Sequence, residues 1–136
     1  MSDELRVRHL GGDRFAITVR DHEILVDQPV DAGGEDTAPT PTELFVAGLA
    51  SCVAFYARRF CARHGVDTTG LEVATEYAIG GRPAQVTELT VLLTPPPALP
   101  PERRDAFLAV ASHCTVHNTL QNPPEANIRL LAGATP

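Results

Sequence analysis

The long apolar segment that begins near Thr40 constrains the fold of this chain more than any other feature. The TPTE motif has the pattern of a capping box, with Thr40 as the N-cap, Pro41 at the first helical position and Glu43 bonded back to the N-cap amide. No helix-breaking residue follows before Gly65, and glycine is the residue that most readily adopts the left-handed conformation at a helix end. Arginines lie in the turns before Gly65, where they oppose the helix dipole. The sequence therefore predicts one helix, about 24 residues or ~36 Å long, that ends at His64.

The first turns of this helix, Leu44 to Ala57, are apolar on every side. A helix of this kind needs burial all round, rather than a single stripe packed on a sheet. The uncharged stretch is about 14 residues long, shorter than the ~20 that a membrane span requires, so we expect a buried core helix and no membrane contact. One chain of 136 residues offers little material to surround it. A second copy of the chain is the natural source of the missing cover.

Short runs rich in β-branched and aromatic residues flank the helix and predict strands. Glycine and aspartate turns separate the first runs into an antiparallel meander, and a Gly-Gly-Arg-Pro connection joins the next runs into a hairpin. The predicted class is α+β, with a single domain over residues 1–136. The elements are strands Arg6 to Leu10, Arg14 to Arg20 and Glu23 to Asp27, the long helix, strands Leu71 to Ile79 and Val86 to Thr94, helices Pro101 to Ser112 and up to Leu120, and a closing strand Ala126 to Leu131.

Charge and composition exclude several classes of protein. The net charge is −6 and the 11 basic residues are all arginine, spread along the chain, which does not suit a nucleic-acid-binding surface. The start of the chain carries mixed charge with no apolar run behind it, so we expect no signal peptide and a cytoplasmic location. Three cysteines, an odd number, do not form the disulfide framework of a secreted domain. Any cysteine chemistry is expected to be reactive rather than structural.

The cysteines stand in different surroundings. Cys52 lies inside the apolar helix, where an isolated cysteine usually acts as a small core residue. Cys61 follows nine residues later, a rotation of ~900° with a rise of ~13.5 Å, so these two thiols cannot meet on one helix. Cys114 is flanked by His113 and His117 near a helix start, where imidazoles and free amides favour a thiolate. The same residues also have the spacing of a partial metal-ligand set, although such a set on one turn more often lies on the surface.

Two stretches together resemble the cysteine motifs of the OsmC/Ohr family, the osmotically induced and organic hydroperoxide resistance proteins. The first, PTELFVAGLASC, ends at Cys52, and the second, HCTVHNTL, holds Cys114, 62 residues further on. The resemblance covers nearly the whole chain, and the Val116-His117 pair is similar to the OsmC-like branch. It implies an OsmC-like α+β fold that forms an intertwined homodimer, with two active sites at the subunit interface.

The resemblance also implies an activity, the thiol-dependent and peroxiredoxin-like reduction of organic hydroperoxides in oxidative-stress defence. Cys52 would be the peroxidatic cysteine, whose thiolate attacks the O–O bond and becomes a sulfenic acid. Cys114 would resolve it as a disulfide, which an external dithiol or a lipoylated reductant would reopen. No metal, flavin or haem cofactor is implied. The alternative is a redox-responsive or small-ligand-binding protein that uses the same cysteines without turnover.

Family members place a glutamate and an arginine around the peroxidatic thiolate. In this chain Thr42 stands where the hydroperoxide-resistance branch carries its glutamate, and Glu43 is one place further on. The absence of an acid at Thr42 favours the non-catalytic alternative. For Glu43 a role as the capping-box acid alone is the alternative, and because it lies nine residues before Cys52 on the opposite face of the same helix, it could contact only the thiol of the other subunit. Arg14 is the nearest match to the family arginine. The other arginines of the N-terminal strands stay open as alternatives: Arg6, Arg8 and Arg20.

Overall fold

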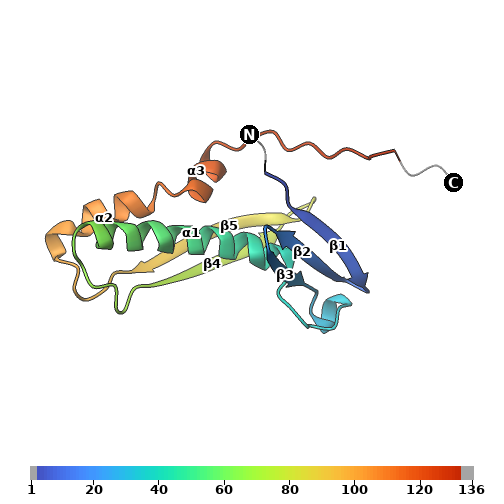
Figure 1. The fold of residues 1–136 in the computed structure, drawn as a ribbon, viewed down its shortest axis with the longest axis horizontal. Helices are drawn as coiled ribbons and strands as arrows, with labels where there is room; N and C mark the ends of the chain where they lie inside the picture. Colours follow the sequence, from blue (N-terminus) through green and yellow to red (C-terminus); the bar gives the residue numbers. More distant parts are fainter. Residues whose placement is uncertain (1–2, 133–136) are drawn as a thin grey trace. The chain divides into compact units, whose positions relative to one another are not determined.

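The computed structural model describes residues 3–132 of the chain. They fall into two compact units, described separately below: the first runs up to Ser51 and includes Val73–Leu93, and the second comprises Cys52–Glu72 and the described residues from Thr94 on. The predicted α+β class is confirmed, with the elements in the expected order as far as the last helix (Figure 1). The elements, with η marking a 3₁₀ turn, are β1 (Arg6–Gly11), β2 (Arg14–Val19), β3 (His22–Val26), η1 (Val30–Ala32), α1 (Pro41–Arg63), β4 (Glu72–Gly80), β5 (Gln85–Thr94), η2 (Pro101–Arg103), α2 (Arg104–Ala111) and α3 (Thr115–Gln121).

The first unit begins with the predicted antiparallel meander. Strand β1 pairs with β2, and β2 pairs with β3. Gly12 turns the chain between β1 and β2 with φ of 55°, in the left-handed region that glycine adopts without strain. Ala16 of β2 and Val26 of β3 are buried. Ala16 lies opposite Leu25 and Val26 lies opposite Phe15, so the two buried side chains are on opposite faces of the meander.

Asp27 organises the loop between β3 and the long helix. Its side chain is 1% exposed and accepts hydrogen bonds from the hydroxyl and amide of Thr37, at 2.7 and 3.0 Å, and from the amide of Gln28, at 2.7 Å. These bonds, above all the one from the Thr37 hydroxyl, hold the pKa of Asp27 at about 2. A buried carboxylate is tolerated when its oxygens are bonded in this way. The loop is therefore closed around an ionised aspartate.

The capping box predicted for the long helix is confirmed. The Glu43 carboxylate accepts from the Thr40 amide at 2.8 Å, and the Thr40 hydroxyl accepts from the Glu43 amide at 3.0 Å. At the other end Gly65 has φ of 64°, and the Val66 amide donates to the Cys61 carbonyl at 2.9 Å. This bond closes a helix at a left-handed residue. Helix α1 ends within one residue of the predicted position.

One side of α1 is buried, and much of the rest is open. Phe45 and Phe55 expose 44% and 52% of their surface. A single chain thus does not supply the all-round cover that the apolar helix was predicted to need, and a second copy stays the predicted source. The buried residues recur at helical spacing: Val46, Leu49, Val53, Ala57, Phe60 and Cys61.

Among the described residues, α1 is also the one helix that is long and apolar enough to cross a membrane. It has 23 residues, and its most apolar window has a mean hydropathy of 1.4. The core helix of a soluble protein has the same length and composition, so this finding is weak evidence for a membrane span.

Strands β4 and β5 form the predicted hairpin, as a separate two-stranded sheet. Side chains along both strands alternate largely between half-buried and exposed positions. This alternation is typical of an antiparallel sheet with one packed and one open face. Tyr77, Ile79 and Leu92 lie among its exposed apolar residues.

In the second unit, α2 lies alongside the C-terminal half of α1 (Figure 1). Phe60 of α1 and Phe107 of α2 meet edge to face with ring centroids 5.8 Å apart, and they are 4% and 3% exposed. The predicted second helix starts as the turn η2, with Pro101 at its first position, and continues as α2. Its apolar face then packs on α1 and forms the core of this unit.

The predicted closing strand over Ala126 to Leu131 is not formed. These residues run as an extended segment after α3 and pair with no strand of the described chain (Figure 1). Ile128 and Leu130 are 101% and 99% exposed. An apolar, β-branched sequence becomes a strand only where a sheet edge offers hydrogen-bond partners. Within residues 3–132 this segment has no such partner.

Candidate active site

Cys52 and Cys114 both belong to the second unit, and their thiols interact. Cys52 lies on α1 and is half-buried, whereas Cys114 is fully buried directly before α3. The two side chains are neighbours in space, because Cys52 is among the groups that raise the pKa of the Cys114 thiol. Both are free thiols. The structure thus brings together two predicted site residues that are 62 positions apart in the sequence.

Cys114 caps α3 with its sulfur, which accepts a hydrogen bond from the His117 amide at 3.3 Å. Burial is the largest influence on this thiol and raises the pKa of Cys114. The His117 amide lowers this pKa, and the neighbouring Cys52 raises it further. The prediction that this helix start favours a thiolate at Cys114 is therefore wrong in its net direction, because burial outweighs the amides.

Tyr56 is a residue of this site that the sequence analysis did not single out. Its hydroxyl oxygen lies 2.9 Å from Oγ1 of Thr115, the residue after Cys114. Tyr56 also follows Cys52 by four positions, which places both residues on one side of α1. The hydrogen bond therefore joins α1 to α3 beside both cysteines. The spacing from Cys52 is a usable signal in the sequence, but only the structure identifies Thr115 as the partner.

The two histidines beside Cys114 use their Nδ1 atoms locally. Nδ1 of His113 donates to the Ala109 carbonyl at 2.6 Å, and Nδ1 of His117 donates to the Ser112 carbonyl. Nε2 is then the nitrogen of each ring that is left for a metal, because a histidine ligand usually donates its other ring N–H to such a partner. Within residues 3–132, no group of three or more His, Cys, Asp or Glu side chains is arranged to hold a metal ion.

Cys61 is 0% exposed and belongs to the core of the second unit. Burial raises the pKa of its thiol. Cys61 is therefore a core residue, because a buried, protonated thiol packs as a small apolar side chain. We predict that it does not react with hydroperoxide.

Glu43 and Arg14, the other predicted site residues, belong to the first unit. The Glu43 carboxylate is engaged in the capping box with Thr40. Arg14 begins β2 and is half-buried. A role for either residue beside a thiolate stays a prediction.

Fold and site together define an α+β protein with an interacting pair of free thiols. The chain belongs to the OsmC-like family: the sequence profile of the family described as OsmC-like protein matches residues 33–129. This match confirms the resemblance that the two cysteine motifs indicate. Among curated proteins, no sequence matches the chain.

Solved structures agree with this assignment. A putative osmotic stress induced and detoxification response protein from Psychrobacter arcticus 273-4 is 25% identical, with a TM-score of 0.78 over 88% of each chain. An organic hydroperoxide resistance protein OsmC from Legionella pneumophila is 21% identical, with a TM-score of 0.65 over 90% of each chain. The organic hydroperoxide resistance protein OhrB of Bacillus subtilis is 18% identical, with a TM-score of 0.62 over 90% of this chain and 93% of that one. The last two similarities show a shared fold.

Proposed function

We propose that this chain is a cysteine-based hydroperoxide reductase, with Cys52 as the peroxidatic and Cys114 as the resolving cysteine. The observation that carries the proposal is that the two free cysteines, 62 positions apart in the sequence, are close enough in the fold for Cys52 to raise the pKa of Cys114. A thiol already beside a newly formed sulfenic acid captures it before further oxidation. Burial and Cys52 raise the pKa of Cys114, which disfavours its thiolate, so Cys52, half-buried on α1, is the proposed nucleophile.

The proposed reaction balances at each step. The Cys52 thiolate attacks a hydroperoxide oxygen, the O–O bond breaks, the alcohol leaves after taking up a proton, and Cys52 becomes a sulfenic acid. The Cys114 thiol then condenses with the sulfenic acid, so that an S–S bond forms and water is released. An external dithiol reduces this disulfide by exchange and is itself oxidised to a disulfide.

The electrons in this scheme pass between sulfur and oxygen throughout, so the reaction requires no metal, flavin or haem. We propose a small dithiol or a lipoylated protein as the reductant. Repeated turnover needs a compartment that keeps thiols reduced, which fits a cytoplasmic location.

Family membership supports the substrate class. The chain is a member of the OsmC-like family, and similar solved structures include the organic hydroperoxide resistance proteins of Legionella pneumophila and Bacillus subtilis. Organic hydroperoxides are therefore the proposed substrates, and defence against oxidative stress is the proposed role.

The proposed working form is an intertwined homodimer. Phe45 and Phe55 are about half exposed on α1, at 44% and 52%, and a stable interface would bury such apolar surface. In this dimer Arg14 and Glu43 are the proposed cation and acid near the Cys52 thiolate. Sedimentation should show a dimer at micromolar concentration, and a stable, fully folded monomer would contradict the proposal.

The cysteine mechanism is tested with the reduced protein and one equivalent of tert-butyl hydroperoxide. We expect a peptide linked between Cys52 and Cys114 in mass spectrometry, with Cys61 unmodified. Cys114→Ser should keep the first oxidation but leave Cys52 as a sulfenic or over-oxidised acid, and Cys52→Ser should abolish both steps. Hydroperoxide consumption without the linked peptide would remove the proposed pairing.

A second measurement separates turnover from the redox-responsive alternative. With dihydrolipoamide or dithiothreitol in excess, an enzyme consumes many equivalents of cumene hydroperoxide and reacts more slowly with H2O2 if organic hydroperoxides are preferred. A protein that forms the disulfide once and is not recycled by any dithiol would instead support the redox-responsive or small-ligand-binding function.

A further inference from the structure

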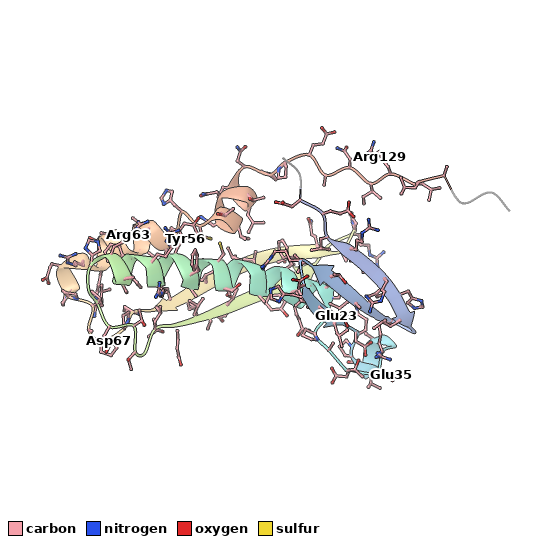
Figure 2. All side chains as sticks on the ribbon, viewed as in Figure 1. Glu23, Glu35, Tyr56, Arg63, Asp67 and Arg129 are labelled. Atoms are coloured by element: carbon pink, nitrogen blue, oxygen red, sulfur yellow. The ribbon has the colours of Figure 1, made fainter. Side chains whose placement is uncertain are left out.

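A pocket of about 330 Å³ lies between α1 and the end of α2 in the second unit. Its volume is at the lower end of the range that small-molecule sites occupy. Both helices contribute to its lining, and Figure 2 shows Tyr56 and Arg63 on α1. The lining residues are Tyr56, Arg59, Arg63, Ala109, Val110 and His113.

Two guanidinium groups give this pocket a positive charge. Arg59 and Arg63 are four positions apart, so they lie on the same side of α1. Within residues 3–132 the ion pairs are Arg6 with Glu4 and Arg8 with Glu23, and neither pocket arginine has a carboxylate partner. The Arg59 guanidinium instead lies over the Phe55 ring, 5.5 Å from its centroid. An anion that enters the pocket therefore meets two cations that no acidic side chain neutralises.

The remaining lining offers apolar contact and few free hydrogen-bonding groups. Ala109 and Val110 of α2 are apolar, and the Tyr56 ring adds an aromatic surface whose hydroxyl already bonds Thr115. Nδ1 of His113 is likewise engaged with a carbonyl. The pocket thus combines a charged side with an apolar side, and a ligand that fits both has an anionic head and an apolar body.

We propose that this pocket is a binding site for small organic carboxylates. The guanidinium groups of Arg59 and Arg63 bind the carboxylate, since the planar fork of arginine matches its two oxygens. Ala109, Val110 and the Tyr56 ring contact the apolar body of the ligand. The site uses residues of one chain, and none of them is a proposed reacting group.

The position of the pocket connects it to the thiol pair. His113 precedes Cys114, and Tyr56 bonds the residue that follows it. A bound carboxylate therefore contacts His113, the neighbour of Cys114, and Tyr56, the partner of Thr115, while binding itself needs neither peroxide nor turnover.

The test is calorimetric titration of the full-length, reduced protein with 4-phenylbutyrate at low ionic strength, beside its neutral primary amide. We expect the amide to bind at least tenfold more weakly, because it lacks the charge that the two arginines recognise. Arg59→Gln and Arg63→Gln should each weaken binding of the carboxylate at least fivefold. Arg58→Gln is the matched control: this neighbouring exposed arginine of α1 does not line the pocket, and its replacement should change affinity less than twofold.

Equal binding of 4-phenylbutyrate and its amide would overturn the proposal, and so would an equal loss in the Arg58→Gln control. Inorganic phosphate is the third ligand, and binding as tight as that of 4-phenylbutyrate would show a general anion patch without a role for the apolar side. Hydroperoxide consumption by the Arg59→Gln and Arg63→Gln variants is measured in parallel. If the protein reduces peroxide but does not bind the carboxylate, only the proposed binding site is wrong. If the protein binds the carboxylate but reduces no peroxide, only the proposed enzymatic function is wrong.

Discussion

The hydroxyl oxygen of Tyr56 lies 2.9 Å from Oγ1 of Thr115. One of these residues is a helical turn beyond Cys52, and the other directly follows Cys114. The hydrogen bond between them therefore holds α1 and α3 together at the point where the two thiols meet. Tyr56 has no part in the proposed electron transfer, so it is a positioning residue.

Tyr56→Phe removes this hydrogen bond and keeps the aromatic ring. A hydrogen bond of this kind contributes ~1 kcal/mol, so we expect the sulfenic acid of Cys52 to be captured by Cys114 about fivefold more slowly. The first reaction of Cys52 with hydroperoxide should change less than twofold. Stopped-flow measurement of the two phases separates these effects, and the loss should appear in the second phase alone.

Tyr77→Phe is the matched control, since Tyr77 is the other tyrosine of the chain and lies on the exposed part of β4. It should leave both phases unchanged. If Tyr56→Phe slows both phases equally, Tyr56 acts on the general stability of the unit and not on the placement of Cys114.

Glu43 offers a separate test of capping against catalysis. Its carboxylate accepts from the Thr40 amide at 2.8 Å, and glutamine can make the same bond. We expect Glu43→Gln to change the free energy of unfolding little, because the capping bond is kept, and to lower the rate of peroxide reduction, because the proposed acid near the Cys52 thiolate is lost. Thr40→Ala, which removes the hydroxyl half of the box, should destabilise the protein by ~1 kcal/mol in urea unfolding. A folded Glu43→Gln protein with an unchanged peroxidase rate would limit Glu43 to its capping role.

Asp27 makes the stability of the protein sensitive to acid. The hydroxyl and amide of Thr37 hold the pKa of Asp27 at about 2, below its ordinary value of 3.8. The stabilisation from a carboxyl with a lowered pKa is present above pH ~4 and is lost as the pH falls toward 2. We expect the urea midpoint to fall in this window, and Thr37→Val, which removes the largest cause of the shift, to make the fall smaller.

Asp31→Asn is the control for this measurement, because Asp31 is an exposed aspartate of the same loop. It should keep the wild-type acid profile. An unchanged profile in Thr37→Val would mean that another group causes the acid sensitivity.

The elements that sequence reasoning predicted well depend on residues close together in the chain. Thr40, Pro41 and Glu43 determine the start of α1 within a few positions of one another, and Gly65 determines its end in the same local way. The segment around Ile128 differs, because its apolar pattern shows a tendency to form a strand but not which edge would pair with it. Pairing is a property of distant parts of the chain, or of another chain.

The candidate site divides in a similar way. Two motifs sufficed to name Cys52 and Cys114, but the polar neighbours of Cys114 suggested an ionised thiol where burial produces the opposite effect. A sequence shows which residues are adjacent, whereas the pKa depends on what surrounds the sulfur in space. Tyr56 escaped notice for the same reason, since its partner Thr115 is 59 positions away.

Replacement of Cys52 tests the interaction between the thiols directly. Burial is the largest cause of the raised pKa of Cys114, and the hydrogen bond and charge of Cys52 add to it. Cys52→Ala removes both contributions and leaves α3 in place, so we expect the pKa of Cys114 to fall. Iodoacetamide reacts with thiolates, and alkylation of Cys114 should therefore begin at a lower pH in this variant than in the wild type.

Cys61→Ala is the control, because Cys61 is not among the groups that shift the pKa of Cys114. Its alkylation profile at Cys114 should match that of the wild type. A change of access alone, caused by the smaller side chain at position 52, would raise the plateau of the alkylation rate without moving the midpoint of its pH profile. If the midpoint shifts in Cys52→Ala and stays in place in Cys61→Ala, Cys52 helps to keep the proton on Cys114. Equal midpoints in both variants would contradict the assignment of Cys52 as the nucleophile of the pair.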